Sequence, residues 1–303
     1  MNHTRKDSQG GDVVADIHYF AATGTPITTE MWKMPILGEP TEFTRRMTIH
    51  DARRSNQQFH LDTNGFQFLT LPPTKRVTAD DDEETIKREY YPELEQIVKD
   101  LYETTNESYS NHHVTGATTA HVFNHVIRAH IHPPTQSTPD SQGRWPQIPS
   151  SHPHVDYASD PAFLAGTQRE LNLPAPIAAL FHTSPRFALL GLWRPLKQVR
   201  RDPLAVCDAA TVPDADYQVR LREFKRTGVK SGNYVLSHGE EGERHEWWYL
   251  SGMREDEMVV FKGFDTWQDL PGWRCPHTAF RLEGSEGEEP RESIEARVVC
   301  FWD

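Results

Sequence analysis

From about residue 185 onward, the chain is a close succession of short apolar or alternating segments separated by turn residues. Strands at this density are typical of an antiparallel sandwich or jelly roll, in which each strand packs one face on a shared core. The sequence therefore predicts an α+β fold, with helices on the outside of a mostly antiparallel barrel. The segments expected to be strands are 187–195, 204–208, 233–237, 246–251, 258–265, 277–280 and 293–302.

Upstream of the strand-rich half, the pattern changes to turns and helices. The segments 59–62 and 65–69 both alternate apolar and polar residues, and Asn64-Gly65 between them is a typical hairpin turn. An acidic run at 80–84 opens a helix whose apolar residues recur at helical spacing. Asp160 caps a further helix that has proline in its first turn. The helices are expected over 80–103, 161–171 and 175–181.

These elements predict a single domain, and its parts follow from composition. We expect a disordered N-terminus (1–12) and then one domain (13–303). The domain comprises a helical and hairpin part (13–132), a proline-rich loop (133–153) and a jelly-roll core (154–303). The proline-rich loop could be a linker between two domains. We prefer the rim of an active site, because residues that can carry chemistry follow it directly and Trp145 offers a side chain for packing.

Charge and cysteine content limit the partners. The chain has 303 residues and a formal net charge of −12, which opposes phosphate backbones and anionic lipids, so we expect neither nucleic acid nor membrane as a partner. Three cysteines cannot form a disulfide framework and fit a reducing compartment. The N-terminus lacks an apolar signal sequence, and no segment approaches the roughly 20 apolar residues of a membrane span. We therefore expect a soluble, cytoplasmic protein, and the sequence leaves a homo-oligomer open.

One short motif suggests a metal site. In an extended segment, residues i and i+2 point to the same side, so His154 and Asp156 can bind one ion together. With the distant His277 they match the two-His-one-carboxylate triad of non-haem Fe(II) oxygenases. The alternative is a strand whose His and Asp are merely solvated, because the chain has 16 histidines and the motif is short. The neighbouring histidines are interpreted as loop or hydrogen-bonded core residues: His125, His130, His132 and His152.

The segment after His277 supports the metal interpretation. Three open positions on iron suit dioxygen and a bidentate 2-oxoglutarate, whose far carboxylate needs a fixed cation such as a forked guanidinium. Arg291 and Ser293 would share one face of an extended segment and could bind that carboxylate. Arg297 lies on the same face and is the competing candidate. Without the metal motif, this would be an ordinary edge strand with a charged solvent face.

From about residue 15 to 302, the sequence resembles the fungal family of gibberellin-desaturase-like and AsaB-type hydroxylase/desaturases. The matching segments are Phe59-His60-Leu61-Asp62 with Asn64-Gly65-Phe66, Glu89-Tyr90-Tyr91-Pro92-Glu93, His154-Val155-Asp156, Leu192-Trp193-Arg194-Pro195-Leu196, Asp202-Pro203-Leu204-Ala205-Val206-Cys207-Asp208, Trp247-Trp248-Tyr249-Leu250, Val260-Phe261-Lys262, His277-Thr278-Ala279-Phe280 and Pro290-Arg291-Glu292-Ser293-Ile294-Glu295.

The resemblance implies a single-domain Fe(II)/2-oxoglutarate oxygenase of secondary metabolism on a double-stranded β-helix (jelly-roll, cupin-like) core. The family's metal ligands would fall on His154, Asp156 and His277, and its co-substrate arginine on Arg291. The chain departs from the family at Gly191, where Asn is common, and at Asp265-Thr266, where Asp-Ser is usual. Either departure could change the substrate pocket, and the family includes hydroxylation, desaturation and ring closure.

Three further groups of residues can be interpreted as functional or as structural. Arg194 alternates with Leu190 and Leu192 and could be a second anion contact inside the barrel, or else form a structural ion pair with Asp202 or Asp208. Arg128 is a weaker candidate of the same kind. Trp247 and Trp248 are expected in the core, and the cysteines, which have no CxxC spacing, are expected to be packing residues.

The function that follows is an Fe(II)- and 2-oxoglutarate-dependent oxygenase that uses O2 to modify a small-molecule substrate. One alternative is a non-catalytic metal- or ligand-binding jelly-roll protein. Another is a zinc hydrolase with the same ligands, which would leave Arg291 without a role. The sequence does not identify the substrate.

Overall fold

The computed structural model describes residues 10–28, 31, 33–72, 76–103, 116–129, 149–223, 228–239 and 244–303. Several predictions fall outside these ranges: those for residues 1–9, for most of the proline-rich loop with Trp145, and for His130 and His132. Asp12 accepts hydrogen bonds from the His50 ring (2.8 Å) and from the Asp51 amide (2.9 Å), so the chain is already tied to a strand at residue 12.

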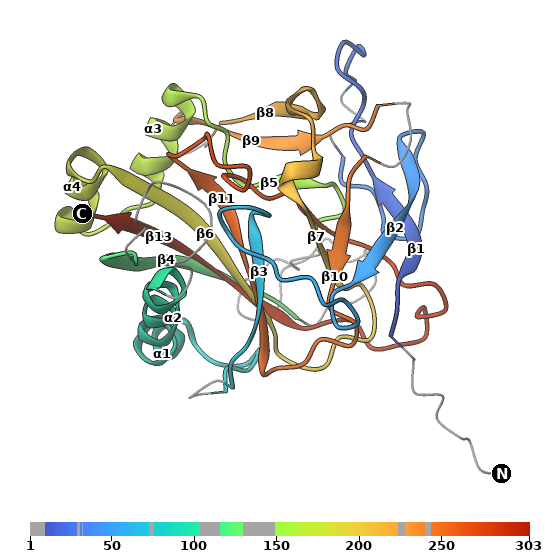
Figure 1. Cartoon of the computed structure of the whole chain (residues 1–303), viewed down its shortest axis with the longest axis horizontal. Coiled ribbons are helices and arrows are strands. Elements are labelled where there is room, and N and C mark those ends of the chain that lie inside the picture. Colours follow the sequence, from blue (N-terminus) through green and yellow to red (C-terminus); the bar gives the residue numbers. More distant parts are fainter. Residues whose placement is uncertain are drawn as a thin grey trace.

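Two β-sheets and four α-helices make up the described residues (Figure 1). The larger sheet contains, in spatial order, β1 (Val13–His18), β2 (Thr44–Asp51), β10 (Trp247–Tyr249), β7 (Leu204–Cys207), β12 (His277–Ala279), β5 (His154–Val155), β9 (Lys230–Leu236) and β8 (Tyr217–Glu223). The smaller sheet contains β3 (Phe66–Thr70), β11 (Glu257–Asp265), β6 (Arg186–Pro195), β13 (Ser293–Trp302) and β4 (Thr119–Arg128). The helices are α1 (Glu83–Glu89), α2 (Tyr91–Glu103), α3 (Pro161–Glu170) and α4 (Ala175–Thr183).

The larger sheet curls so that its first strand returns toward the opposite side. Just beyond β1, the amide of Phe20 donates to the carbonyl of Leu236 at the end of β9 (2.7 Å). Pairing is antiparallel throughout except between β2 and β10. The curled sheet and the smaller sheet confirm the predicted α+β jelly-roll fold.

Helices α1 and α2 cover one face of the smaller sheet. Their buried residues Ile86, Leu94 and Val98 share a cluster with Leu190 and Val260 from the sheet strands. The opposite face of the same strands presents Trp193 and Phe261 toward the larger sheet. The smaller sheet is therefore buried on both sides, which explains the almost continuous apolar runs of β6, β11 and β13.

All seven strands predicted in the second half are present, with ends that differ by a few residues at most. The three charged or alternating strands β2, β4 and β8 were not predicted. Each has only one neighbour over much of its length or lies at a sheet edge, and each carries many polar residues. Because β1 to β4 supply edges to both sheets, the sheets extend well beyond the expected core at 154–303.

The predicted hairpin is wrong. Residues 59–62 form no strand, and β3 pairs with β11 instead. The side-chain oxygen of Asn64 accepts from the His60 amide (3.0 Å), and Gly65 adopts φ +83°, so the chain folds into a compact turn here. Phe59 then packs on Phe66 across the turn, with ring centroids 4.8 Å apart.

The predicted helix from 80 to 103 is present as two helices that meet at Tyr90. Pro92 causes the break, because proline has no amide hydrogen and its ring clashes with the carbonyl four residues earlier. Asp82 caps α1 by accepting from the Thr85 amide. The predicted helices after the proline-rich loop are α3, with Asp160 as its cap, and α4.

Among the described residues, no helix is long and apolar enough to cross a membrane.

Candidate metal centre

Strands β5 and β12 are neighbours in the larger sheet and bring together three residues that are far apart in sequence. His154 and His277 are directly paired, with ring centroids 4.3 Å apart. Asp156 follows β5 and points to the same side as His154, as the two-residue spacing predicts. Ligand atoms of His154, Asp156 and His277 all lie within 4.8 Å of one another, and this is the one such group found among the described residues.

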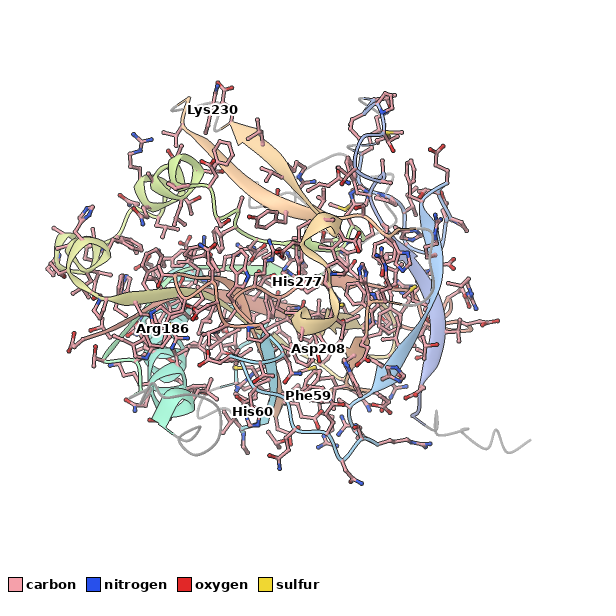
Figure 2. All side chains as sticks on the ribbon, turned by 45° about the horizontal axis from the view of Figure 1, so that its top comes forward. Phe59, His60, Arg186, Asp208, Lys230 and His277 are labelled. Atoms are coloured by element: carbon pink, nitrogen blue, oxygen red, sulfur yellow. The ribbon has the colours of Figure 1, made fainter. Side chains whose placement is uncertain are left out.

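The cluster lies in the interior between the two sheets, where Figure 2 labels His277 near the middle of the molecule. His277 is 4% exposed, and the side chains of His154 and Asp156 are 13% and 11% exposed. A small molecule can reach the two partly exposed ligands, while bulk water is largely excluded.

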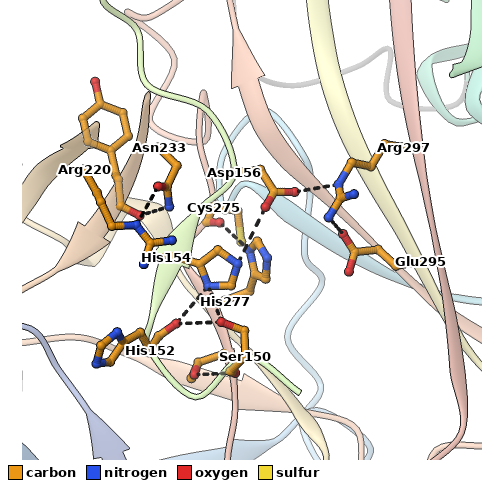
Figure 3. A network of polar contacts seen from close by, with 12 residues as sticks. Ser150, His152, His154, Asp156, Arg220, Asn233, Cys275, His277, Glu295 and Arg297 are labelled. Carbon is orange, nitrogen blue, oxygen red and sulfur yellow. Dashed lines mark hydrogen bonds and ion pairs between the residues drawn. The ribbon is translucent and has the colours of Figure 1, made fainter. Parts of the chain in front are cut away.

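Both imidazoles are held by backbone carbonyls (Figure 3). His154 Nδ1 lies 2.8 Å from the carbonyl oxygen of His152, and His277 Nδ1 lies 3.2 Å from that of Cys275. A carbonyl oxygen can only accept, so each Nδ1 carries a hydrogen, and in the neutral ring Nε2 then keeps its lone pair. This is the tautomer that binds a metal through Nε2.

The two oxygens of Asp156 have different neighbours. Oδ1 lies 3.6 Å from His154 Nε2, within the cluster, and Oδ2 accepts from Arg297 Nε at 3.3 Å. The second carboxylate of the region, Glu295, lies 2.8 Å from Arg297 on its other side. The contact of Arg297 with Asp156, a candidate metal ligand, was not predicted from the sequence.

A small cavity of about 20 Å³ adjoins the cluster. Its lining includes His154, His277, Trp193, Phe261 and Arg291. The structure therefore places Arg291, the predicted co-substrate arginine, beside the same cavity as His154 and His277. Arg297 does not line this cavity.

Arg291 is buried without a carboxylate partner among the described residues. One terminal nitrogen donates to the carbonyl of Asp202 (2.7 Å), and its Nε has no hydrogen-bond partner there. Burial, and then the positive charge of Arg128, lower the pKa of Arg291 to about 9, so it remains charged at neutral pH. A buried guanidinium that has no direct carboxylate contact and lies beside a cavity favours an anionic ligand.

Ser293 and Arg128 lie directly opposite each other on β13 and β4. Ser293 is fully buried, and its hydroxyl has no hydrogen-bond partner in the described part of the chain. Arg128 lines the cavity and pairs with Glu295 at 2.8 Å. Burial alone would raise the pKa of Glu295, but the charges of Arg297 and Arg128 outweigh it and hold that pKa below its usual value.

Arg194 is not brought to this site. It shares the helix-covered face of the smaller sheet with Leu190 and Leu192, and it lines a separate cavity there. Its partner is Glu93 of α2, at 3.6 Å, rather than Asp202 or Asp208. The alternation noted in the sequence is correct, but the face concerned points away from the metal cluster.

The remaining expectations concern the core. Trp247 and Trp248 are buried in two apolar clusters, and all three cysteines are buried and unpaired. His125 bonds to the hydroxyl of Tyr91 (2.9 Å), and His152 packs edge-on against Phe20. These histidines are structural, although the backbone carbonyl of His152 orients a metal-cluster residue.

The chain is similar to known proteins over nearly its whole length. A family model described as an oxidoreductase/YMDC permease-like domain matches residues 17–301. The hydroxylase/desaturase efuI of Hormonema carpetanum is 31% identical over 274 residues, which cover 86% of this chain and 84% of that protein. The alpha-ketoglutarate-dependent dioxygenase phiK of a fungal species is 28% identical and aligns over 98% of both chains.

The fold is similar to a solved structure as well. The iron and alpha-ketoglutarate-dependent endoperoxidase NvfI superposes with a TM-score of 0.68, over 96% of this chain and 98% of that one. At 24% identity, this likeness concerns the fold.

Proposed function

The chain belongs to the family of fungal hydroxylase/desaturases and related oxidoreductases, and from this premise we propose that it is an Fe(II)- and 2-oxoglutarate-dependent oxygenase. Its relatives include proteins named for dependence on alpha-ketoglutarate, another name for 2-oxoglutarate. The proposed reaction is hydroxylation, desaturation or oxidative ring closure of a small molecule of secondary metabolism.

The observation that carries the proposal is the cluster of His154, Asp156 and His277. Two neutral imidazole nitrogens and one carboxylate oxygen form the donor set that non-haem iron prefers when it must keep open positions. The hydrogen bonds at both Nδ1 atoms leave Nε2 available on each ring, which supports metal binding rather than a solvated pair.

The residues that line the cavity beside the cluster suit the co-substrate. A 2-oxoglutarate bound to the metal through its keto acid end would present its other carboxylate to a cation nearby. Arg291 is buried, charged and without a carboxylate partner in the described residues, and we propose that it binds this group together with the Ser293 hydroxyl. Arg128 lines the same cavity, where it is paired with Glu295.

The protein's own residues position the reactants and exclude water. Trp193 and Phe261 form an apolar wall of the cavity, and the interior position of the cluster limits access of solvent. Iron and 2-oxoglutarate, when bound, would activate dioxygen so that it can oxidise an unactivated C–H bond.

An anaerobic titration tests the proposal. Fe(II) followed by 2-oxoglutarate should produce a weak visible charge-transfer band, and admission of O2 should then release succinate and CO2 in equal amounts. A protein that binds Fe(II) without the band, or a band without any succinate, would contradict an oxygenase. Hydrolysis supported by Zn(II) in place of Fe(II) would favour the hydrolase alternative.

A further inference from the structure

We propose that Arg297 is a positioning residue for the metal ligand Asp156, and that it determines which carboxylate oxygen faces the metal. This inference rests on the proposed function, because it takes Asp156 to be a ligand. Arg297 Nε donates to Oδ2 at 3.3 Å, while Oδ1 is the oxygen near His154 Nε2. A free carboxylate can bind an ion through either oxygen or both, and a guanidinium on one of them favours binding through the other.

Arg297 is itself held in place from its other side. Its terminal nitrogen lies 2.8 Å from Glu295, two residues earlier on β13, and Glu295 is in turn paired with Arg128 on β4. The result is a row of alternating charges from Asp156 through Arg297 and Glu295 to Arg128, part of which Figure 3 shows. Opposite charges in such a row attract one another and so restrict the orientation of each side chain.

Strand β13 is regular at Arg297. It pairs with β6 without interruption, and the residue opposite Arg297 is Gly191, which presents no side chain of its own. The register shift between β13 and β4 lies in β4, where Phe123 is skipped between Asn124 and Val122, the partners of Arg297 and Val298.

The electrostatic environment is consistent with this role. Burial by itself would lower the pKa of Arg297, but the charges of Glu295 and Asp156 outweigh it and raise that pKa above its usual value. Arg297 is thus a permanently charged partner for Asp156. Arg291 differs, because no described carboxylate pairs with it and it lines the cavity.

Arg291 and Arg297 therefore have different roles. Arg297 acts through Asp156 on the metal, and Arg291 acts on the co-substrate. Loss of a group that orients a metal ligand typically lowers metal affinity by about 10- to 100-fold. A loss of that size, without a change in 2-oxoglutarate affinity, is the signature expected of Arg297.

The test measures binding of Co(II) alone to the full chain without oxygen, from its visible ligand-field absorption. Arg297→Met removes the charge and keeps the bulk, and it should weaken Co(II) binding by about 10- to 100-fold and change the band shape. Arg297→Lys should recover part of the affinity, because it retains the charge without the fork. At saturating Co(II), both variants should bind 2-oxoglutarate as the wild type does.

Arg53→Met is the matched control. Arg53 makes a two-pronged ion pair with the buried Glu257, which lies at the start of β11, and its bonds go to none of the cluster residues. It should lower the unfolding temperature and leave the Co(II) spectrum unchanged. Should Arg297→Met fail to fold, Glu295→Gln removes the charge that holds Arg297 and should weaken Co(II) binding in the same direction.

Wild-type Co(II) affinity and spectrum in folded Arg297→Met would overturn the positioning role. A selective loss of 2-oxoglutarate binding would overturn it too, because Arg297 would then bind the co-substrate. Asp156→Ala tests the metal centre itself, separately from the role of Arg297. If Asp156→Ala also leaves Co(II) binding unchanged, the metal centre itself is wrong and the inference fails with it.

Discussion

The aromatic ring of Phe261 lies on the imidazole of His277, with ring centroids 4.2 Å apart and an angle of 38° between the planes. Phe261 is directly opposite Gly191 in the pairing of β11 with β6. A Cβ atom at Gly191 would lie 2.4 Å from two carbons of the Phe261 ring. The ring therefore occupies the space that a side chain at position 191 would need, and from there it packs against His277.

Gly191→Ala should consequently disturb both packing and metal binding. The new methyl group must push the Phe261 ring toward His277 or force a shift of the strands. Overpacking of this kind typically costs about 1–3 kcal/mol of unfolding free energy. Urea unfolding would measure that cost, and Co(II) titration would show weaker binding.

Gly287→Ala provides the control, because a Cβ there meets no atom within 4 Å. It should leave both measurements unchanged. Replacing the ring in Gly191→Ala/Phe261→Leu should recover part of the lost stability. If Gly191→Ala unfolds at the wild-type urea concentration, the Phe261 ring is free to move and does not support His277.

The central strands of the smaller sheet, β6, β11 and β13, were predictable because both of their faces are buried. Runs such as those of β6 and β13 contain few polar residues, and turn residues bound them clearly. Strands β2 and β8 carry alternating charges and are solvated on one side, so their sequences resemble loops. The hairpin failed for another reason. Asn64-Gly65 does make a turn, but the Asn64 side chain accepts from the nearby His60 amide and donates to the distant Asp208, and the flanking segments do not pair.

The site was predictable to the extent that it depends on strand periodicity. A two-residue spacing places His154 and Asp156 on one side, whatever the rest of the fold does. Periodicity cannot tell which face of a sheet looks toward the metal, and Arg194 was misjudged for that reason. It also cannot separate Arg291 from Arg297, which have the spacing of one strand face. The cavity, which Arg291 lines, and the contact of Arg297 with Asp156 distinguish them.

His154→Ala, Asp156→Ala and His277→Ala should each abolish turnover. Removing one of three ligands destroys the chelate, and the described residues contain no other group of three metal-ligating side chains that could replace it. Succinate release and Co(II) titration check the prediction, with far-UV circular dichroism as the control for folding. Near-wild-type turnover in any one of these variants would remove that residue from the set of ligands.

The protein should lose stability in mild acid through His245. This residue is buried between Asp216 (3.0 Å from Nε2) and the Tyr19 hydroxyl (3.0 Å from Nδ1). Burial lowers its pKa from 6.5 to about 4, so the folded chain keeps it neutral. Between these values the unfolded chain binds the additional proton, so stability falls as pH decreases. The loss from His245 should be on the order of 2 kcal/mol between about pH 6.5 and pH 5.

Urea unfolding of wild type and His245→Gln at about pH 7 and pH 5 isolates that contribution. Glutamine can keep one of the polar contacts and does not titrate, so the variant is expected to be less stable than wild type at pH 7 but to lose less on acidification. The difference between the two acid-induced losses is the quantity to compare. Equal losses in both proteins would mean that His245 is already protonated in the folded state.

Arg291→Lys should raise the apparent KM for 2-oxoglutarate by roughly 10- to 100-fold, because lysine keeps the charge but loses the fork that binds a carboxylate. Arg291→Ala should be worse, since the carboxylate would then be desolvated without a partner. Co(II) affinity should stay near wild type in both variants, because Arg291 contacts the Asp202 carbonyl rather than a metal-cluster residue. Arg297→Lys, assayed alongside, should show the opposite pattern, with weaker Co(II) binding and an unchanged KM. If Arg291→Lys leaves the KM unchanged, the cavity binds 2-oxoglutarate by other residues, and Arg128 becomes the first to test.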